Sequence, residues 1–443
     1  MQNPMLFYST NKRSRAVDFK TALLRGLAED GGLYMPSELN NFQFSHAYRQ
    51  AGIFNFQFWK ILRKFIDIPE KDLEKITRES FNFAAPLVKL DKNLYVLELF
   101  HGPTLSFKDF GARFMARAMN YYLTKSKQKL NIIVATSGDT GSAVAAGFYG
   151  LPNIRVFILY PSKRISKLQE QQIATWGKNI VALEVKGDFD DCQRLAKQAL
   201  SDPKLRKKIN LSSANSINIG RLLPQMYYYF AGYYRLKTLY PSAEGGSASD
   251  GKSYTLNPIF VVPSGNFGNL TAGLFAKRLG LPVNKFVAAV NINSQIPEYL
   301  RTGKLKQSKT RLTFSNAMDV GNPSNWARIM DLYHGSPSAI KKDLEASTVT
   351  ESETEKTIKE VYKKYGYIAD PHTAVGLSAA ITRDSSGPTI VLATAHPAKF
   401  PEIVEKAIGK KFPLPPALRN VLDKKKLSLT ITTKEEFFER IKK

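Results

Sequence analysis

The chain has 443 residues, of which 43% are hydrophobic, and it carries a formal net charge of +26 at pH 7. This length is sufficient for two or three domains with a large buried core, and the composition is that of a globular protein. The single cysteine, Cys192, excludes an intrachain disulfide and a cysteine-rich zinc site, and it is consistent with a reducing compartment.

Residues 1–95 are rich in Phe and Lys and predict a mainly helical N-terminal region, in which one helix ends at the turn of Gly31 and Gly32. From residue 96 onward, short apolar runs alternate with helical patterns such as 140–149 and 269–279, which predicts an α/β fold with open parallel sheets. The candidate strands are NIIVAT (131–136), IRVFILY (154–160), IVALEV (180–185), PIFVVPS (258–264), FVAAVN (286–291) and TIVLATA (389–395).

Two further segments are distinctive in composition. The stretch 241–253, PSAEGGSASDGKS, predicts a flexible surface loop, and the Lys-rich tail beyond Gly409 predicts a last helix in KEEFFERIKK. Residues 246–253, GSASDGKS, match the phosphate-loop pattern GxxxxGK[ST]. Because no strand precedes this match and no helix follows it, we reject an ATP-binding site there.

The segment HGPTLSFKDFGARFMARAMNYY (101–122) places Lys108 among small polar and aromatic residues at the start of a helical pattern. A lysine that is shielded from bulk water can act as a neutral amine, as Schiff-base chemistry requires. The alternative is a surface lysine at the start of a helix.

Two glycine-containing turns each follow an apolar strand and precede a helix. PSGNFGN (263–269) predicts a cup of backbone N–H groups for a phosphate, the alternative being an ordinary turn. ATSGDTGSAVAAGF (135–148) predicts a similar cup for a carboxylate. Asp139 brings like charge to that cup, and its alternative role is the N-cap of the helix.

Two later segments offer hydrogen-bonding groups. NSINIGR (215–221) provides amides, a hydroxyl and the guanidinium of Arg221, which could bind a phosphate or carboxylate. The alternative is that Asn215 or Ser216 caps a helix and Arg221 lies on its solvated face. In TIVLATAHPAKF (389–400), Thr394 and His396 lie where a strand ends, although ordinary turn hydrogen bonding would also explain them. No histidine pair has metal-ligand spacing, so we expect no metal site.

These segments, together with YST…VDFKTALLRGLAEDGGLYMP and DPHTAVG (370–376), occur in the order in which they resemble segments of threonine synthases, especially the longer bacterial and fungal type. The resemblance spans residues 8–400. It implies the fold-type-II pyridoxal-phosphate (PLP) architecture of the tryptophan synthase β type. The implied domains are an N-terminal domain (1–95), a large PLP-binding domain (96–130 and 220–443) and a small mobile substrate-clamping domain (131–219).

The resemblance also implies roles for individual residues. Lys108 would carry the cofactor PLP and shuttle protons, and Thr394 would hydrogen-bond the pyridine nitrogen. The cofactor phosphate would lie against Gly265, Asn266, Phe267, Gly268 and Asn269. The substrate would be held at its carboxylate and phosphate by Ser137, Asp139, Thr140, Ser216, Asn218 and Arg221.

The implied activity is that of a lyase, the conversion of O-phospho-L-homoserine and water into L-threonine and phosphate, the last step of threonine biosynthesis. The partner expected is therefore a small anionic substrate, with no nucleic acid and no membrane, and the protein is expected to be cytoplasmic and a monomer or homodimer. The N-terminus lacks the apolar segment of a secretory signal, and no apolar run reaches the roughly 20 residues that span a bilayer.

Two alternatives remain open. A PLP-dependent phospho-lyase that releases 2-oxobutyrate from phosphohomoserine would use the same fold and site. A protein of another class, a basic nucleic-acid-binding protein on an inactive PLP fold, would explain the net charge. The first alternative is decided by the product, and the second by salt-dependent binding to DNA.

Overall fold

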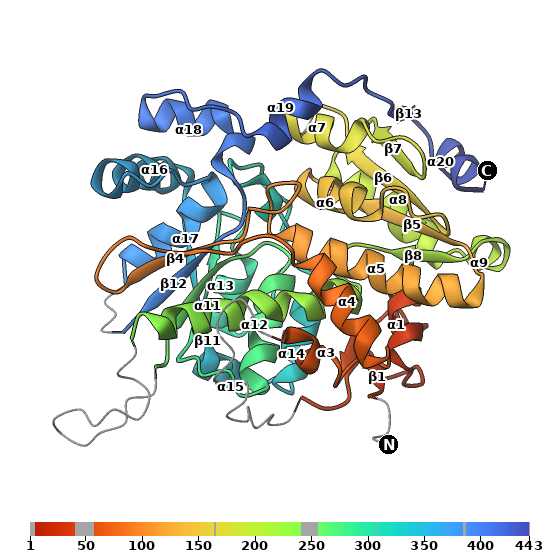
Figure 1. Cartoon of the computed structure of the whole chain (residues 1–443), viewed down its shortest axis with the longest axis horizontal. Coiled ribbons are helices and arrows are strands. Elements are labelled where there is room, and N and C mark those ends of the chain that lie inside the picture. Colours follow the sequence, from red (N-terminus) through yellow and green to blue (C-terminus); the bar gives the residue numbers. More distant parts are fainter. Residues whose placement is uncertain are drawn as a thin grey trace.

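The computed structural model describes residues 5–39, 57–163, 165–240, 256–306, 308–383 and 387–442 (Figure 1). The predicted loop at 241–253 lies outside these residues. Among the helices described, none combines the length and the apolar character needed to cross a membrane. The two large sheets of parallel strands confirm the predicted α/β class.

The larger sheet has six strands in the order β11-β10-β9-β12-β4-β3. Its neighbours are parallel except for β3 and β4, which are antiparallel. The bounds are β3 Leu87–Lys89, β4 Leu94–Glu98, β9 Ile259–Pro263, β10 Phe286–Val290, β11 Leu344–Thr348 and β12 Thr389–Ala393. The central strands β9, β10 and β12 are buried throughout, which confirms the three predicted strands there. The edge strand β11, with the sequence LEAST, was not predicted because its polar side chains interrupt the apolar run.

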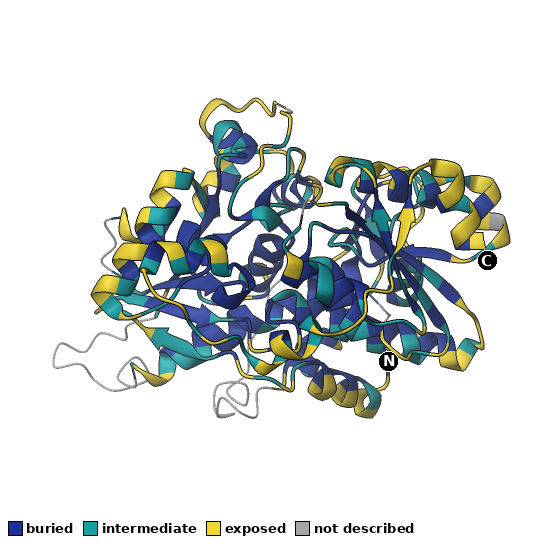
Figure 2. Ribbon diagram, turned by 90° about the horizontal axis from the view of Figure 1, so that it is seen from above, coloured by how far each residue is buried: buried dark blue, intermediate teal, exposed yellow. Residues whose placement is uncertain are grey.

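Helices cover both faces of this sheet. Alternate residues of one strand belong to different cores: Phe260 and Ile390 pack in one apolar cluster, and Val261 and Val391 pack in another. The helices of the first face are α11 Met226–Thr238, α12 Gly268–Arg278, α13 Gln295–Thr302, α14 Trp326–Leu332 and α15 Pro337–Asp343, and those of the second are α16 Glu351–Tyr365, α17 Pro371–Ile381 and α18 Pro401–Ile408. Figure 2 shows that the exposed residues lie mainly on the outer helices and connections.

The smaller sheet has five parallel strands in the order β13-β7-β6-β5-β8. Its elements are β5 Leu130–Ala135, β6 Ile154–Pro161, β7 Ile180–Val185, β8 Leu211–Ser213 and β13 Leu429–Ile431, with helices α6 Asp139–Phe148, α7 Lys167–Ala174, α8 Phe189–Ser201, α9 Pro203–Lys208 and α20 Lys434–Lys442. The strands predicted at 131–136, 154–160 and 180–185 are confirmed, as is the helix in the tail. The short strand β13 was not predicted. It pairs with β7, so the chain returns from the larger sheet to the smaller one.

The N-terminal region contains an antiparallel pair, β1 Phe7–Ser9 with β2 Tyr34–Pro36, and the helices α1 Phe19–Arg25, α3 Phe58–Leu62 and α4 Glu70–Ser80. The first helix ends earlier than predicted. Gly26 adopts φ 76° and its N–H binds Ala22 O, so the left-handed cap stops α1 before the Gly31–Gly32 turn is reached. The expectation that the helix ends at that turn was wrong, because a single glycine was sufficient to end it.

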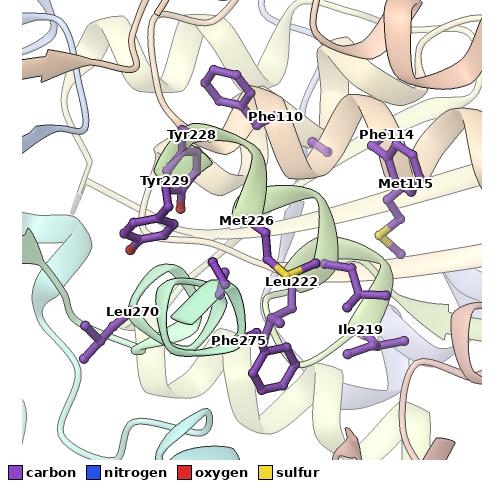
Figure 3. Packing of buried hydrophobic residues seen from close by; sticks show 14 of the residues in the cluster. Phe110, Phe114, Met115, Ile219, Leu222, Met226, Tyr228, Tyr229, Leu270 and Phe275 are labelled. Carbon is purple, nitrogen blue, oxygen red and sulfur yellow. The ribbon is translucent and has the colours of Figure 1, made fainter. Parts of the chain in front are cut away.

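The two sheets are joined by a shared apolar core around α5, Lys108–Ser126, and the short helices α10 Ile219–Leu222 and η2 Leu223–Gln225. Figure 3 shows Phe110, Phe114 and Met115 of α5 beside Leu222 and Met226. The remaining elements described are α19 Pro416–Leu422 and the short turns η4 Asn316–Met318 and η5 Pro397–Lys399. Because most residues of α5 are buried between the two sheets, its first residue, Lys108, has a fixed position there.

Candidate active site

A cavity of about 660 Å³ lies where strands of both sheets end and the next helices begin. Such strand ends are the usual ligand sites of open α/β sheets. Its lining includes all the residues predicted from the sequence except one: Lys108, Ser137, Asp139, Thr140, Ser216, Arg221, Gly265, Asn266, Phe267, Gly268, Asn269 and Thr394. The exception is Asn218.

Lys108 is the first residue of α5, and its backbone N–H donates to Ser106 Oγ. Its Nζ lies 3.5 Å from Asp139 Oδ2 and 4.7 Å from the centre of the Phe107 ring. Burial lowers the pKa of the Lys108 ammonium. Asp139 opposes this effect, and the positive charges of Lys399 and Arg221 reinforce it. The environment therefore favours a neutral, nucleophilic amine.

The turn between β9 and α12 forms the predicted cup. Phe267 adopts the left-handed conformation at φ 60° directly before α12, which turns successive N–H groups toward the helix start. Within the described part of the chain, no protein acceptor takes the backbone N–H groups of residues 265–269. A Cβ at Gly265 would lie 2.6 Å from Met318 Cα, so the close approach requires glycine. This geometry is that of a phosphate site.

Side chains of the same turn brace it. Asn269 Nδ2 donates to Pro263 O, and its Oδ1 accepts from Ser264 Oγ, so this amide holds the two ends of the turn together. Asn266 Nδ2 instead donates to Ser216 Oγ at 2.7 Å. The cup is thereby linked to the NSINIGR segment.

A second cup lies at the start of α6. Thr136 Oγ1 accepts the N–H groups of Gly138 and Gly141, which folds the turn. No acceptor among the described residues takes the backbone N–H groups of Ser137, Asp139 or Thr140. The N-cap position is occupied by Gly138 at φ 135°, and Asp139 is the first residue inside the helix. The alternative role of Asp139 as N-cap was therefore wrong, and the cup retains donors for a carboxylate.

The Asp139 carboxylate is almost fully buried and is held by side chains from distant parts of the sequence. Its Oδ1 accepts from Lys399 Nζ at 2.7 Å and from Gln169 Nε2 at 3.1 Å. Burial alone would raise the pKa of Asp139, but the Lys399 and Lys108 ammonium groups outweigh it and hold the pKa well below its usual range. Sequence reasoning missed Lys399, although it stands in the ATAHPAKF segment; the signal was a lysine inside an apolar stretch at the end of a strand.

The NSINIGR segment divides into residues that face the cavity and one that does not. Ser216 Oγ accepts from Asn266 and, at 3.2 Å, from Asn325 Nδ2, so its own proton remains available for a ligand. Arg221 Nη1 donates to Ala214 O at 2.5 Å, while its buried Nε has no protein acceptor among the described residues. Burial lowers the pKa of Arg221 to about 10, so it stays charged at neutral pH.

Asn218 points into the protein instead. Its Oδ1 caps α10 by accepting from Gly220 N, and its Nδ2 donates to Leu23 O and Ser213 O. All of its side-chain groups are thus bound to protein, and the structure does not bring it to the cavity. The predicted contact with substrate is corrected to a role in shaping the segment.

Two residues from the C-terminal half complete the wall. Thr394 follows β12 directly, its carbonyl accepts from Phe107 N at 2.9 Å, and the residue lines the cavity. His372, from the DPHTAVG segment, was not predicted as a site residue. Its Nδ1 lies 2.7 Å from Asp370 Oδ2, and its Nε2 accepts from Ala317 N, which fixes a neutral tautomer with the proton on Nδ1.

Family models match nearly the whole chain. The model described as "Pyridoxal-phosphate dependent enzyme" covers residues 80–393, "Threonine synthase N terminus" covers 6–81, and "Threonine synthase, C-terminal" covers 373–440. Among curated relatives, the threonine synthase of Escherichia coli K12 is 42% identical over 95% of both chains. That of Saccharomyces cerevisiae is 35% identical over 99% of this chain and 96% of the relative.

Solved structures agree with these matches. The crystal structure of threonine synthase from Escherichia coli has a TM-score of 0.88 and 40% identity, with 99% of each chain covered. The PLP-bound threonine synthase from Brucella melitensis also has a TM-score of 0.88, at 35% identity and the same coverage.

Proposed function

Because the chain belongs to the threonine synthase family of PLP-dependent enzymes, we propose that the cavity around Lys108 converts O-phospho-L-homoserine and water into L-threonine and phosphate. The resemblance noted in the sequence is confirmed by the family models and relatives. One observation carries the assignment of residues: a buried amine of lowered pKa lies in one cavity with two cups of unused N–H groups. The two cups match the two anionic ends that must be held, namely the cofactor phosphate and the substrate carboxylate.

The residues present fit the cofactor. Lys108 would bind it covalently, the N–H groups of 265–269 would hold its phosphate, and the Thr394 hydroxyl would accompany the ring nitrogen. Glycine at position 265 lets this cup pack directly against the backbone of Met318, which a Cβ would meet at 2.6 Å. When bound, PLP supplies a ring that delocalises negative charge from the substrate carbon.

The substrate would lie between the second cup and Arg221. The N–H groups of Ser137 and Thr140 would bind its carboxylate, while Ser216 Oγ and the Arg221 guanidinium would bind its phosphate. Asp139, whose oxygens are already bound to Lys399, Gln169 and Lys108, would orient the amine rather than touch the carboxylate. Asn218 would contribute indirectly, by capping the helix that carries Arg221.

In the reaction, Lys108 would transfer protons, and Arg221 and Ser216 would stabilise the leaving phosphate. The neutral Lys108 Nζ would take the α-proton of the substrate, release it, and then, as a neutral amine again, take a β-proton. The γ-carbon–oxygen bond breaks and its electron pair leaves with the phosphate, whose charge Arg221 and Ser216 would stabilise. The oxygen of one water adds at the β-carbon with loss of one proton. The γ-carbon gains a proton to become the methyl group of threonine, the α-carbon regains a proton, and the departing phosphate takes the remaining one.

Domain closure and setting complete the proposal. We propose that residues 131–219 form a small domain that moves relative to residues 1–95, 96–130 and 220–443, closes over the substrate and excludes other water. The predicted boundary at the C-terminus needs correction, because β13 and α20 complete the smaller sheet and would move with it. We also propose a cytoplasmic monomer or homodimer that needs no nucleic acid; the buried thiol of its single cysteine, Cys192, supports a reducing compartment.

The test combines a spectrum with product analysis. Wild-type protein loaded with PLP should show a visible band near roughly 410–420 nm, and phosphohomoserine should give threonine and phosphate in equal amounts. Lys108→Ala should lose both the band and the turnover. Release of 2-oxobutyrate in place of threonine would support the lyase alternative. Persistence of the band in Lys108→Ala would overturn the assignment of the lysine.

A further inference from the structure

Lys399 is a completely buried lysine to which the proposed reaction gives no part. It ends the short turn η5 behind β12, and its Nζ donates to Asp139 Oδ1 at 2.7 Å and to Thr104 O at 3.1 Å. Burial of an ammonium group carries a desolvation penalty of several kcal/mol per ion, and replacement of a buried pair by apolar residues is often neutral or stabilising. Packing alone therefore does not account for a charge at this place.

The Asp139 carboxylate lies between two lysines at unequal distances. Lys399 makes a short, charge-assisted contact with Oδ1, whereas Lys108 Nζ lies 3.5 Å from Oδ2, beyond the normal length of such a bond. Gln169 Nε2 adds a further donor to Oδ1. The strongest contact of the Asp139 carboxylate is therefore with Lys399, and its interaction with the Lys108 ammonium group is weak.

We propose that Lys399 is a positioning residue that acts through Asp139: by binding this carboxylate closely, it keeps Asp139 from holding Lys108 as an ammonium ion and so keeps the Lys108 amine reactive. The catalytic importance of this interaction rests on the proposed function, but the protonation of Lys108 can be measured without turnover. The positive charge of Lys399, like that of Arg221, also lowers the pKa of Lys108, whereas Asp139 raises it.

Other ionisable groups also face this cluster, and every variant used below retains them. Asp109 on α5 accepts from Thr104 N and Oγ1 and faces both Lys399 and Arg221. His372 faces Asp139 from α17, and His396 faces Lys399 from the start of η5. Burial lowers the pKa of His396 to about 4, so this imidazole is neutral across the pH range of the test. Differences between variants therefore isolate Lys399 and Asp139.

The experiment measures the proton affinity of Lys108 in cofactor-free full-length protein. Trace acetylation with acetic anhydride from pH 6 to 11, followed by mass spectrometry of the Lys108 peptide, gives the pH at which this amine becomes reactive. Lys399→Met should raise that midpoint by about one unit or more, and the labelling rate at pH values below both midpoints should fall about tenfold, because Lys108 becomes the main partner of Asp139.

The reverse substitution provides the matched comparison. Asp139→Asn should lower the midpoint, because Lys399 then faces Lys108 without a compensating carboxylate. The double variant, Lys399→Met with Asp139→Asn, should return toward the wild type. Lys399→Arg keeps the charge and should restore most of the wild-type behaviour, and Lys406→Met, an exposed position on α18, should have no effect.

A second readout is the pH titration of the visible band of the PLP-loaded variants, which should shift in the same directions. The inference is overturned if folded Lys399→Met keeps the wild-type midpoint, or if both single substitutions move it the same way. If Lys399→Met fails to fold, the double variant is compared with Asp139→Asn. The added Lys399→Met substitution should raise the Lys108 midpoint, and a further decrease would overturn the inference. These results do not depend on the product, so failure of the proposed function remains a separate outcome.

Discussion

At the scale of single residues, the cavity is defined by donors that the protein does not use. The Arg221 guanidinium is buried, yet its Nε has no acceptor among the described residues, and the Ser216 hydroxyl receives two amide donors and keeps its own proton. Ser216 lines the cavity, so its unused proton is available to a ligand there, and the buried guanidinium of Arg221 places positive charge in the same wall. Both groups are donors, which favours an anion.

Arg221→Lys should weaken the handling of the phosphate. Lysine keeps the charge but lacks the planar fork of donors, so kcat/KM for phosphohomoserine should fall by about 10- to 100-fold, corresponding to roughly 1.4–2.8 kcal/mol. Steady-state kinetics measure this loss, and the visible band should be unchanged. The exposed Arg301→Lys serves as control. An equal loss of cofactor binding would contradict a role confined to the substrate.

At the scale of elements, each cup depends on one strand, one tight turn and one helix. The β9–α12 turn is pressed against η4, so that Gly265 touches the backbone of Met318. η4 is held in turn by His372, whose Nε2 accepts from Ala317 N. The shape of the cup therefore depends on contacts with two other segments as well as on its own sequence.

Gly265→Ala should damage the cup. The added Cβ would meet Met318 Cα at 2.6 Å, a distance that requires the backbone to move, so affinity for PLP should fall by about tenfold or more, corresponding to roughly 1.4 kcal/mol. Titration of cofactor-free protein with PLP, followed by absorbance, measures the loss. At Gly387 a Cβ meets nothing within 4 Å, so Gly387→Ala is the matched control. Unchanged affinity in Gly265→Ala would contradict the assignment of the cup.

The segment that contains η4 is also held by a buried carboxyl group. Asp319 Oδ1 accepts from Asn291 Nδ2 and Thr313 Oγ1, and its Oδ2 accepts from Thr313 N. Burial raises the pKa of Asp319 to about 6, although these hydrogen bonds oppose the rise. A carboxyl whose pKa is higher in the folded than in the unfolded state stabilises the fold below pH 4, and this contribution is lost as the pH rises to 6.

Asp319→Asn should remove this pH dependence. Relative to the variant, the wild type should lose roughly 2 kcal/mol of its free energy of unfolding between pH 4 and 7, at about 1.36 kcal/mol per pKa unit. Thermal unfolding of both proteins at pH 4.5, 5.5 and 7 checks the difference. Parallel curves for the two proteins would show that Asp319 titrates normally.

At the scale of the whole molecule, one buried arginine connects three regions. Arg328 on α14 is fully buried; its guanidinium donates to Tyr34 O in the N-terminal region, to Ser216 O and Ile217 O beside the cavity, and to Asn325 Oδ1. The N-terminal region also lines the mouth of the cavity through Asn11 and Gly32. Arg328 therefore fixes the position of the N-terminal region relative to the segment that contains Ser216.

Arg328→Met should loosen this connection. It leaves the buried carbonyl group of Tyr34 and the part-buried carbonyl groups of Ser216 and Ile217 without these donors, so the free energy of unfolding should fall by about 3 kcal/mol. Because Ser216 is displaced, the KM for phosphohomoserine should rise more than PLP affinity falls. Denaturant unfolding and kinetics measure the two effects. Arg278→Met, whose guanidinium lies over the Tyr333 ring, is a control outside the connection.

The sequence alone determined the α/β class, the central strands and the segments that surround the cavity. Buried parallel strands are continuous apolar runs, and a turn that needs glycine or a capping residue contains that residue in its own sequence. Both features can therefore be predicted from the sequence alone. The six predicted strands and the position of Lys108 before an apolar helix follow from such local chemistry.

Only the tertiary structure decided which polar groups meet. The pairing of Asp139 with Lys399, the hydrogen bond from Asn218 Nδ2 to Leu23 O and the addition of β13 to the smaller sheet join residues that lie far apart in the chain. An apolar stretch around a lysine indicates burial, but the local sequence does not identify the carboxylate that compensates its charge, because packing brings that carboxylate within reach. The protonation of the reactive amine therefore depends on the completed fold.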